Sequence, residues 1–162
     1  MECATDSGKA TLVNSPRFGE FAYRETDVIE FPWGLRGFAG LRRWLFLSLE
    51  SHPTFVWLQS LDDLSVALPA ANPWMIFEDY DPEVPPYAFL ALDIQGAADF
   101  TYLCVVIVNP GAAEMTMNLA APIVVNLRTR KAHQVDLAGR SYSVRQPIPR
   151  RSDEQALTAT AS

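Results

Sequence analysis

The stretch Phe100–Val108 has the sequence FTYLCVVIV, which is apolar almost throughout. β-Branched and aromatic residues dominate it, and its length suits a strand better than a helix. A run without alternation between polar and apolar positions is typical of a strand whose two faces are both covered. We therefore expect a central β-strand here, and we extend the prediction outward from it.

Shorter runs of similar composition lie on both sides of this stretch. Before it we expect two short strands within Gly19–Phe31, joined near Glu25-Thr26-Asp27, and then Arg43–Leu49, Thr54–Ser60 and Leu64–Leu68. After it we expect Met115–Leu119, Pro122–Leu127, Gln134–Leu137 and Tyr142–Val144. Many short strands with little helix between them indicate an antiparallel barrel or sandwich, which the local pattern does not distinguish. Our prediction is an all-β fold, a small antiparallel β-barrel-like single domain with at most one or two short helices.

The length and composition are those of one domain, because 162 residues with 49% hydrophobic side chains can close one core. We expect residues 1–14 to be a mobile lead, residues 15–149 to form the domain, and residues 150–162 to be a disordered tail. The first residues lack the features of a signal peptide, and no run of 18 apolar residues occurs. We expect a cytoplasmic protein that does not enter a membrane and is a monomer when free.

Charge is distributed unevenly along the chain, whose formal net charge is -6. Residues 1–127 carry 6 basic and 16 acidic side chains, whereas residues 128–151 carry seven basic side chains and the single acid Asp136. An acidic body repels nucleic acid and speeds encounter with basic proteins. The plainer interpretation is that these charges only keep the protein soluble.

The segment Asn72–Pro86 differs from the strands around it. Its prolines forbid a long helix, so we expect an exposed loop and a short helix at about Pro86–Leu92. The loop combines aromatic side chains with carboxylates, which suits a binding loop with apolar anchors and electrostatic steering. Alternatively, the carboxylates are a solvated face and the aromatic rings close one end of the barrel.

Few residue patterns indicate chemistry. His52 and His133 are placed like surface histidines, and Cys3 and Cys104 offer neither a disulfide framework nor a metal-ligand spacing. We expect Cys104 to be a small core residue. Neither a Gly-x-Ser-x-Gly elbow nor a glycine-rich phosphate loop is present. We therefore expect no cofactor, no metal and no enzymatic activity.

The residues also resemble a known family, because six segments match FliW proteins in the correct order between Phe21 and Ile148. Phe31–Phe38 resembles F-x-x-G-L-x-G-F, Phe55–Ser60 resembles F-x-W-L-Q-S, and Asn72–Tyr80 resembles D-P-x-x-F-x-x-D-Y. Asn118–Asn126 resembles N-L-x-A-P-I-V-I-N, and the closing Q-V and Y-x-x-R-x-P-[LI] pieces resemble Gln134-Val135 and Tyr142–Ile148.

The resemblance implies a non-catalytic flagellar assembly factor that works as a partner switch. FliW proteins bind flagellin in the cytoplasm as a chaperone. They also bind the RNA-binding translational regulator CsrA, which represses flagellin translation. Once flagellin has been exported, free FliW sequesters CsrA at a surface away from its RNA site, which relieves the repression non-competitively.

Two groups of residues are expected to serve this function. The partner-binding group is the loop around Tyr80, comprising Trp74, Phe77, Glu78, Asp79, Tyr80, Asp81 and Glu83. The structural group comprises Gly34 and Gly37 in a turn, Leu58 in the core, and Asn118, Pro122 and Asn126, where the amides would satisfy backbone groups beside the proline.

Two other functions fit parts of the sequence. The first is a β-barrel enzyme that uses Glu78 and Asp79 as an acid/base pair. The second is an RNA-binding module that uses the basic segment Arg128–Arg151, although that segment lacks the aromatic spacing of a stacking platform. Our expectation remains no direct contact with nucleic acid.

Overall fold

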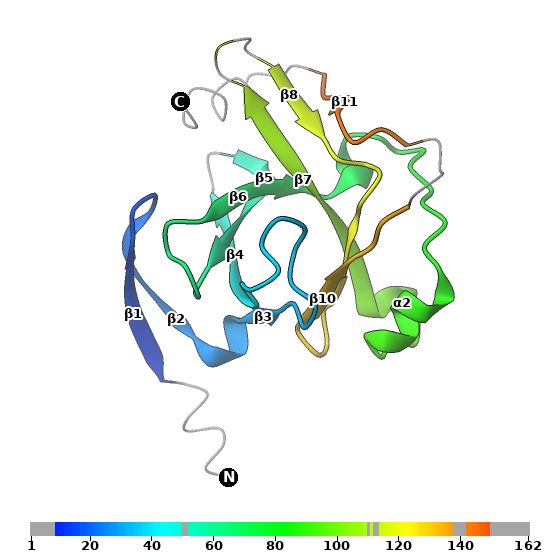
Figure 1. The fold of residues 1–162 in the computed structure, drawn as a ribbon. Coiled ribbons are helices and arrows are strands. Elements are labelled where there is room, and N and C mark those ends of the chain that lie inside the picture. Colours follow the sequence, from blue (N-terminus) through cyan, green and yellow to red (C-terminus); the bar gives the residue numbers. More distant parts are fainter. Residues whose placement is uncertain (1–8, 50–51, 110, 112–113, 138–141, 150–162) are drawn as a thin grey trace.

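The computed structural model describes residues 9–49, 52–109, 111, 114–137 and 142–149 (Figure 1). The strands are β1 Ala10–Ser15, β2 Gly19–Arg24, β3 Ile29–Glu30, β4 Arg43–Leu49, β5 His52–Ser60, β6 Ala67–Ala71, β7 Phe100–Asn109, β8 Glu114–Met117, β9 Ile123–Asn126, β10 Lys131–Gln134 and β11 Gln146–Pro147. The helical elements are the 3-10 turns η1 Glu25–Asp27, η2 Pro73–Met75 and η3 Ala97–Asp99, and the α-helix α2 Pro86–Ala91.

A closed barrel forms the centre of the molecule. The hydrogen-bonded order runs β9-β7-β6-β5-β4-β3-β10 and returns to β9, which makes seven strands. Neighbouring strands are antiparallel except β3 and β10, which pair in parallel where Lys131 faces Glu30. The predicted all-β, barrel-like fold is confirmed, and the barrel rather than the sandwich is the architecture.

The stretch FTYLCVVIV forms the long strand β7, as predicted, and joins the barrel to a second layer. Its first part, Phe100–Leu103, pairs with β9, and its last part, Val106–Asn109, pairs with β8. Three consecutive residues from Tyr102 to Cys104 are buried, so both faces are covered there. The prediction is wrong at the far end, where Ile107 is 48% exposed because β7 extends beyond the barrel.

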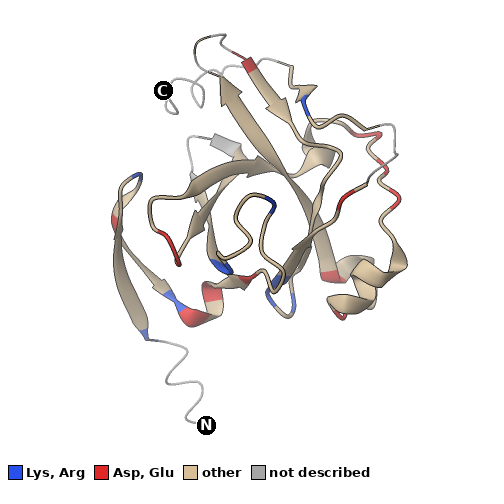
Figure 2. Ribbon diagram, in the orientation of Figure 1, with Lys and Arg blue, Asp and Glu red and all other residues tan. Residues whose placement is uncertain are grey.

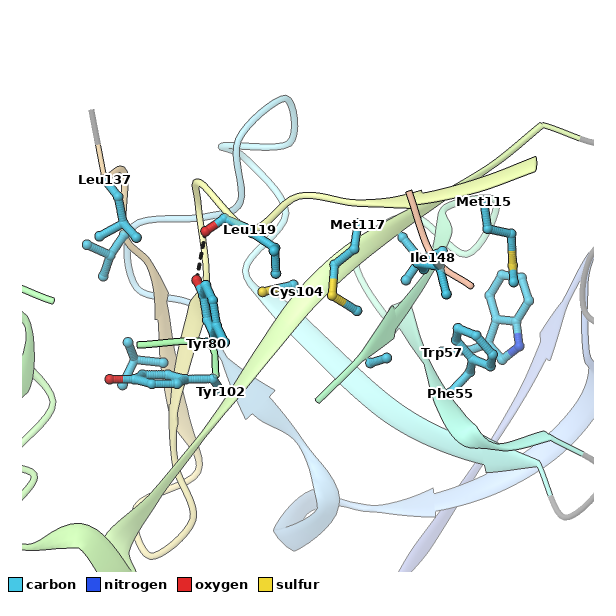
Figure 3. Close-up of a cluster of buried hydrophobic side chains, with 14 of the residues drawn as sticks. Phe55, Trp57, Tyr80, Tyr102, Cys104, Met115, Met117, Leu119, Leu137 and Ile148 are labelled. Atoms are coloured by element: carbon cyan, nitrogen blue, oxygen red, sulfur yellow. Dashed lines mark hydrogen bonds between the residues drawn. The ribbon is translucent and has the colours of Figure 1, made fainter. Parts of the chain in front are cut away.

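Successive side chains of the barrel strands alternate in direction, so they pack into two separate cores. Every strand of the barrel contributes to the inner core, which contains Ile29, Phe31, Leu35, Trp44, Leu58, Ala70, Leu103, Ile123, Val125 and Ala132. The outer core, part of which is drawn in Figure 3, contains residues of β5, β6, β7 and β9 that point away from the inner core. Residues of β8, α2 and the loops around them cover it. Because successive side chains of a strand point to opposite faces, both cores draw on the same strands.

The loop between β3 and β4 lies over one mouth of the barrel and appears in cyan at the centre of Figure 1. Leu35 is 3% exposed and packs into the inner core, and an isolated bridge pairs it with Phe38. The loop turns at Gly34 and Gly37, whose φ angles are +72° and +88°. The barrel mouth is therefore closed by the chain itself.

The N-terminal part corrects one prediction. Residues 10–14, expected to be mobile, form most of β1, which pairs along its whole length with β2. The turn between the two strands ends at Gly19, whose φ of +71° suits a three-residue hairpin loop. Phe18 packs edge-on against Trp57, with ring centroids 5.6 Å apart, and ties the hairpin to the outer core. Residues 1–8, including Cys3, and the expected tail 150–162 lie outside the described residues.

Three strand predictions are displaced from the observed elements. Residues 61–66 form a turn because Asp63 accepts hydrogen bonds from Ser65, so the strand predicted at Leu64–Leu68 begins later, as β6. The strands predicted at Gln134–Leu137 and Tyr142–Val144 are instead β10 and β11. Val135 and Leu137 are buried without belonging to a strand, since their amides donate to single carbonyls of the segment before β9. The short helix predicted near Pro86 is present as α2.

Candidate protein-binding surface

The loop between β6 and α2 begins with a locally determined turn. The side-chain oxygen of Asn72 accepts from the amide of Trp74 at 2.9 Å, and Pro73 occupies the first position of η2. The Trp74 indole donates to the carbonyl of Tyr80 at 2.8 Å and lies against the Tyr102 ring at 4.9 Å. Trp74 is 40% exposed. Its indole is therefore held in place while part of it remains accessible.

Tyr80 corrects an expectation, because it is buried rather than presented to a partner. It is only 4% exposed, and its hydroxyl donates to the carbonyl of Leu119 at 2.7 Å (Figure 3). Burial raises the pKa of the Tyr80 hydroxyl well above its usual range, so the group stays a protonated donor. Phe77 is half-buried and packs against the same outer core. Both rings anchor the loop from within.

The four carboxylates of the loop, in contrast, face solvent. Glu78, Asp79, Asp81 and Glu83 are all exposed. Between residues 44 and 127 the sequence contains no lysine or arginine but ten acidic residues. Acidic positions follow the chain from η2 to α2 without a basic one among them (Figure 2). This part of the chain therefore carries a net negative charge.

Exposed apolar side chains accompany these carboxylates. Trp74 and Met75 on η2 are 40% and 54% exposed, and Tyr87 and Leu90 on α2 are 60% and 78% exposed. Ring contacts link Trp74 to Tyr102, Tyr102 to Phe100 and Phe100 to Phe89, so η2 and α2 both pack beside the start of β7. We call the following set the acidic surface: Trp74, Met75, Glu78, Asp79, Asp81, Glu83, Tyr87 and Leu90.

Three members of the acidic surface, Met75, Tyr87 and Leu90, are not among the residues predicted from the sequence. A signal for the last two was available. Tyr87 and Leu90 are three residues apart in a segment that begins with Pro86, so both lie on the outer face of a helix whose Ala88 is buried. Met75 carried no such signal, because its exposure depends on how η2 packs on β7.

The Cys104 thiol, the His133 ring and the loop carboxylates lie in different environments. Burial raises the pKa of the Cys104 thiol to about 12. Burial lowers the pKa of His133, whose ring lies tilted against the Trp33 ring with centroids 4.7 Å apart. Glu78 and Asp79 lie in open solvent on the acidic surface. Among the described residues, no group of three or more His, Cys, Asp or Glu side chains is arranged to hold a metal.

In the described part of the basic segment, Arg128 and Arg130 lie in the turn between β9 and β10, Lys131 begins β10, and Arg145 precedes β11. Arg128 donates to the carbonyl of Asp93 at 2.8 Å and pairs with its carboxylate at 3.3 Å. Arg130 donates to the carbonyl of Asp27 at 3.1 Å, so it also serves local structure. Figure 2 shows basic positions at separate places on the ribbon. Arg140, Arg150 and Arg151 lie outside the described residues.

Asn118, Pro122 and Asn126 lie where the chain passes from β8 through β9. Asn126 is fully buried; its amide nitrogen donates to the Leu92 carbonyl at 2.6 Å, and its oxygen accepts from the Arg128 amide at 2.8 Å. The oxygen of Asn118 accepts from the amide of Ala120 at 3.1 Å. The carbonyl of Pro122 accepts from the amide of Val135 at 2.9 Å. Leu58 is fully buried in the inner core.

Within the described part of the chain, the helices are all too short to cross a lipid bilayer. The closed barrel, with exposed carboxylates and exposed apolar side chains on the loop and helix beside it, defines a small all-β barrel domain. The family model described as FliW protein matches residues 11–148. The chain belongs to the FliW family.

Individual relatives agree with this assignment. A protein of Pseudothermotoga lettingae named flagellar assembly factor FliW is 35% identical over 135 residues, which cover 83% of this chain and 86% of the relative. A protein of Clostridium tetani with the same name is 32% identical and covers 84% of this chain and 94% of the relative. A crystal structure of the flagellar assembly factor FliW superposes with a TM-score of 0.79 at 25% identity, over 87% of this chain and 99% of that one.

Proposed function

We propose that this protein is a cytoplasmic, non-catalytic flagellar assembly factor that binds flagellin as a chaperone and also sequesters the translational regulator CsrA. Membership of the FliW family and the name shared by its relatives support flagellar assembly. Release of flagellin would free the protein to capture CsrA and so relieve repression of flagellin translation. The protein acts by binding, without a cofactor and without direct contact to RNA.

The observation that carries the proposal is the pairing of exposed carboxylates with exposed apolar side chains on the acidic surface. Trp74 and Leu90 offer apolar contact area, and Glu78 and Asp79 offer negative charge beside it. A basic RNA-binding protein carries the opposite charge, so attraction brings the two together quickly. A negative protein docked beside an RNA site also weakens RNA binding through its field, without occupying the site.

The direct test is a calorimetric titration of the purified protein with its cognate CsrA, repeated after saturation with flagellin. We expect tight binding of CsrA by the free protein and little binding once flagellin is bound. Failure to bind either protein would contradict the proposed function and leave only the fold and the family.

A charge-reversal pair locates the site. Glu78→Lys with Asp79→Lys should weaken binding to the basic partner at least tenfold, because two attractive contacts become repulsive. The matched control is Glu20→Lys with Glu114→Lys, which changes the net charge equally at exposed positions on β2 and β8. Equal losses for the two variants would mean that only net charge matters and that the acidic surface is not the site.

A further inference from the structure

The acidic surface is held from outside its own segment, by a tyrosine of the closing segment Tyr142–Ile148. The hydroxyl of Tyr142 accepts a hydrogen bond from the amide of Asp81 at 2.8 Å, although 61 positions separate the two residues. The Tyr142 ring also packs edge-on against the Tyr80 ring, with centroids 4.7 Å apart. Tyr142 therefore contacts the loop through both its ring and its hydroxyl.

These contacts are part of a closed ring of hydrogen bonds and chain connections that links the loop, Leu119 and the closing segment. Tyr80 donates through its hydroxyl to the Leu119 carbonyl at 2.7 Å, and the Leu119 amide donates to the Ser143 carbonyl at 3.0 Å. Ser143 follows Tyr142, which accepts from Asp81, and Asp81 follows Tyr80. Three segments far apart in the sequence thus fix one another at this point.

The Asp81 amide lies among the carboxylates of the acidic surface. Pro82 follows and has no N–H group, and Glu78, Asp79 and Glu83 lie on either side of this point in the sequence. The carbonyl of Tyr80, on the same peptide group as that amide, accepts from the Trp74 indole at 2.8 Å. The peptide group between Tyr80 and Asp81 is therefore hydrogen-bonded both to η2 and to the closing segment. The carboxylates of the loop lie before and after it in the sequence.

We propose that Tyr142 is a positioning residue for the acidic surface, so that the closing segment belongs to the binding machinery without touching the partner. The inference rests on the proposed function, since it assigns the acidic surface to partner binding. A loop held in its bound shape loses less conformational freedom on binding, which raises affinity. Removing the hydroxyl alone leaves the ring packing in place and frees the Asp81 amide.

The test uses the full chain carrying Tyr142→Phe. Hydrogen exchange of the Asp81 amide is measured without any partner, and affinity for flagellin and CsrA is measured by calorimetry. We expect faster exchange at Asp81, unchanged exchange in β7, and affinity reduced roughly threefold to tenfold, the size expected for one lost hydrogen bond. The control is Tyr23→Phe on the β1–β2 hairpin, which should leave both the Asp81 exchange and the affinity unchanged.

The outcomes separate this inference from the proposed function. Unchanged exchange at Asp81 would show that Tyr142 does not hold the loop and would overturn the inference even if both partners bind. Faster exchange with unchanged affinity would also overturn it, since the loop would then be held for stability alone. If the unaltered protein binds neither partner, the proposed function fails and the positioning role fails with it, whatever the exchange shows.

Discussion

Gly34 and Gly37 lie three residues apart in the loop over the barrel mouth and both have a positive φ angle, yet their surroundings differ. A Cβ atom added at Gly34 would lie 2.5 Å from the backbone oxygen of Ala39, whereas one added at Gly37 would meet nothing within 4 Å. Both glycines have a left-handed φ, which other residues adopt only with strain. Comparing substitutions at these two positions therefore distinguishes the cost of backbone strain from the cost of a steric clash.

Gly34→Ala should lower the free energy of unfolding by about 3 kcal/mol, because strain and a clash with backbone are combined. Gly37→Ala, the control, should cost about 1 kcal/mol from strain alone. Urea unfolding followed by tryptophan fluorescence measures both values. Equal costs would mean that the loop shifts freely and does not depend on the close approach at Ala39.

The burial of Tyr80 could not be predicted from the local sequence. Its neighbours are acidic and the segment is bounded by prolines, so local composition indicates exposure. The burial of Tyr80 depends on the carbonyl of Leu119, which lies 39 positions away. The exposed state of Glu78 and Asp79, in contrast, was predictable, because ionised side chains are seldom buried without a partner.

The helix α2 is too short to be stable alone, and a buried amide fastens it to the barrel. Asn126 at the end of β9 donates to the Leu92 carbonyl just after the helix and accepts from the amides of Arg128 and Thr129 at 2.8 and 3.1 Å. One side chain thus satisfies backbone groups from α2 and from the turn before β10. Since Tyr87 and Leu90 are carried on α2, the acidic surface depends on this contact.

Asn126→Ala should lower the free energy of unfolding by about 3 kcal/mol, because it leaves several backbone groups without a partner in a buried place. The control Asn118→Ala removes an amide that is only half-buried and should cost about 1 kcal/mol. Chemical denaturation gives both values. A small loss at Asn126 would indicate that water replaces the amide and that α2 is held mainly by its apolar contacts.

Strands were predictable where side chains alternate or form long apolar runs, as in β4, β5 and β7. They were misplaced where pairing, rather than composition, decides the boundaries. β10 begins at Lys131 in a polar stretch because it pairs with β9 and β3. β11 has only the two residues Gln146 and Pro147, which pair in register with Met117 and Thr116 of β8. The positions of such short strands depend on the strands with which they pair, so no local sequence pattern predicts them.

Over the whole molecule, charge is segregated, and binding to a basic partner should depend strongly on salt. Raising NaCl from about 0.1 M to about 1 M shortens the screening length from roughly 10 Å to roughly 3 Å. We expect the affinity for CsrA to fall on the order of tenfold over this range. Calorimetry at several salt concentrations measures the slope.

Two variants distinguish the apolar contribution to this affinity from the electrostatic contribution. Trp74→Ala should weaken binding by a similar factor at every salt concentration, because it removes apolar contact. Glu78→Lys with Asp79→Lys should flatten the salt dependence. If the slope were unchanged in the charge-reversal variant, the electrostatic attraction would have to come from another part of the molecule.

The parallel pairing of β3 with β10 has a consequence for how the chain folds. It joins Glu30 to Lys131, so the ring of strands cannot close until the chain has extended as far as Lys131. Pairings of such high contact order form slowly, because loop-closure entropy is lost before any compensating contact is made. During synthesis on the ribosome, the hairpin of β4 and β5 forms early, but its apolar inner face stays uncovered until β9 and β10 have emerged.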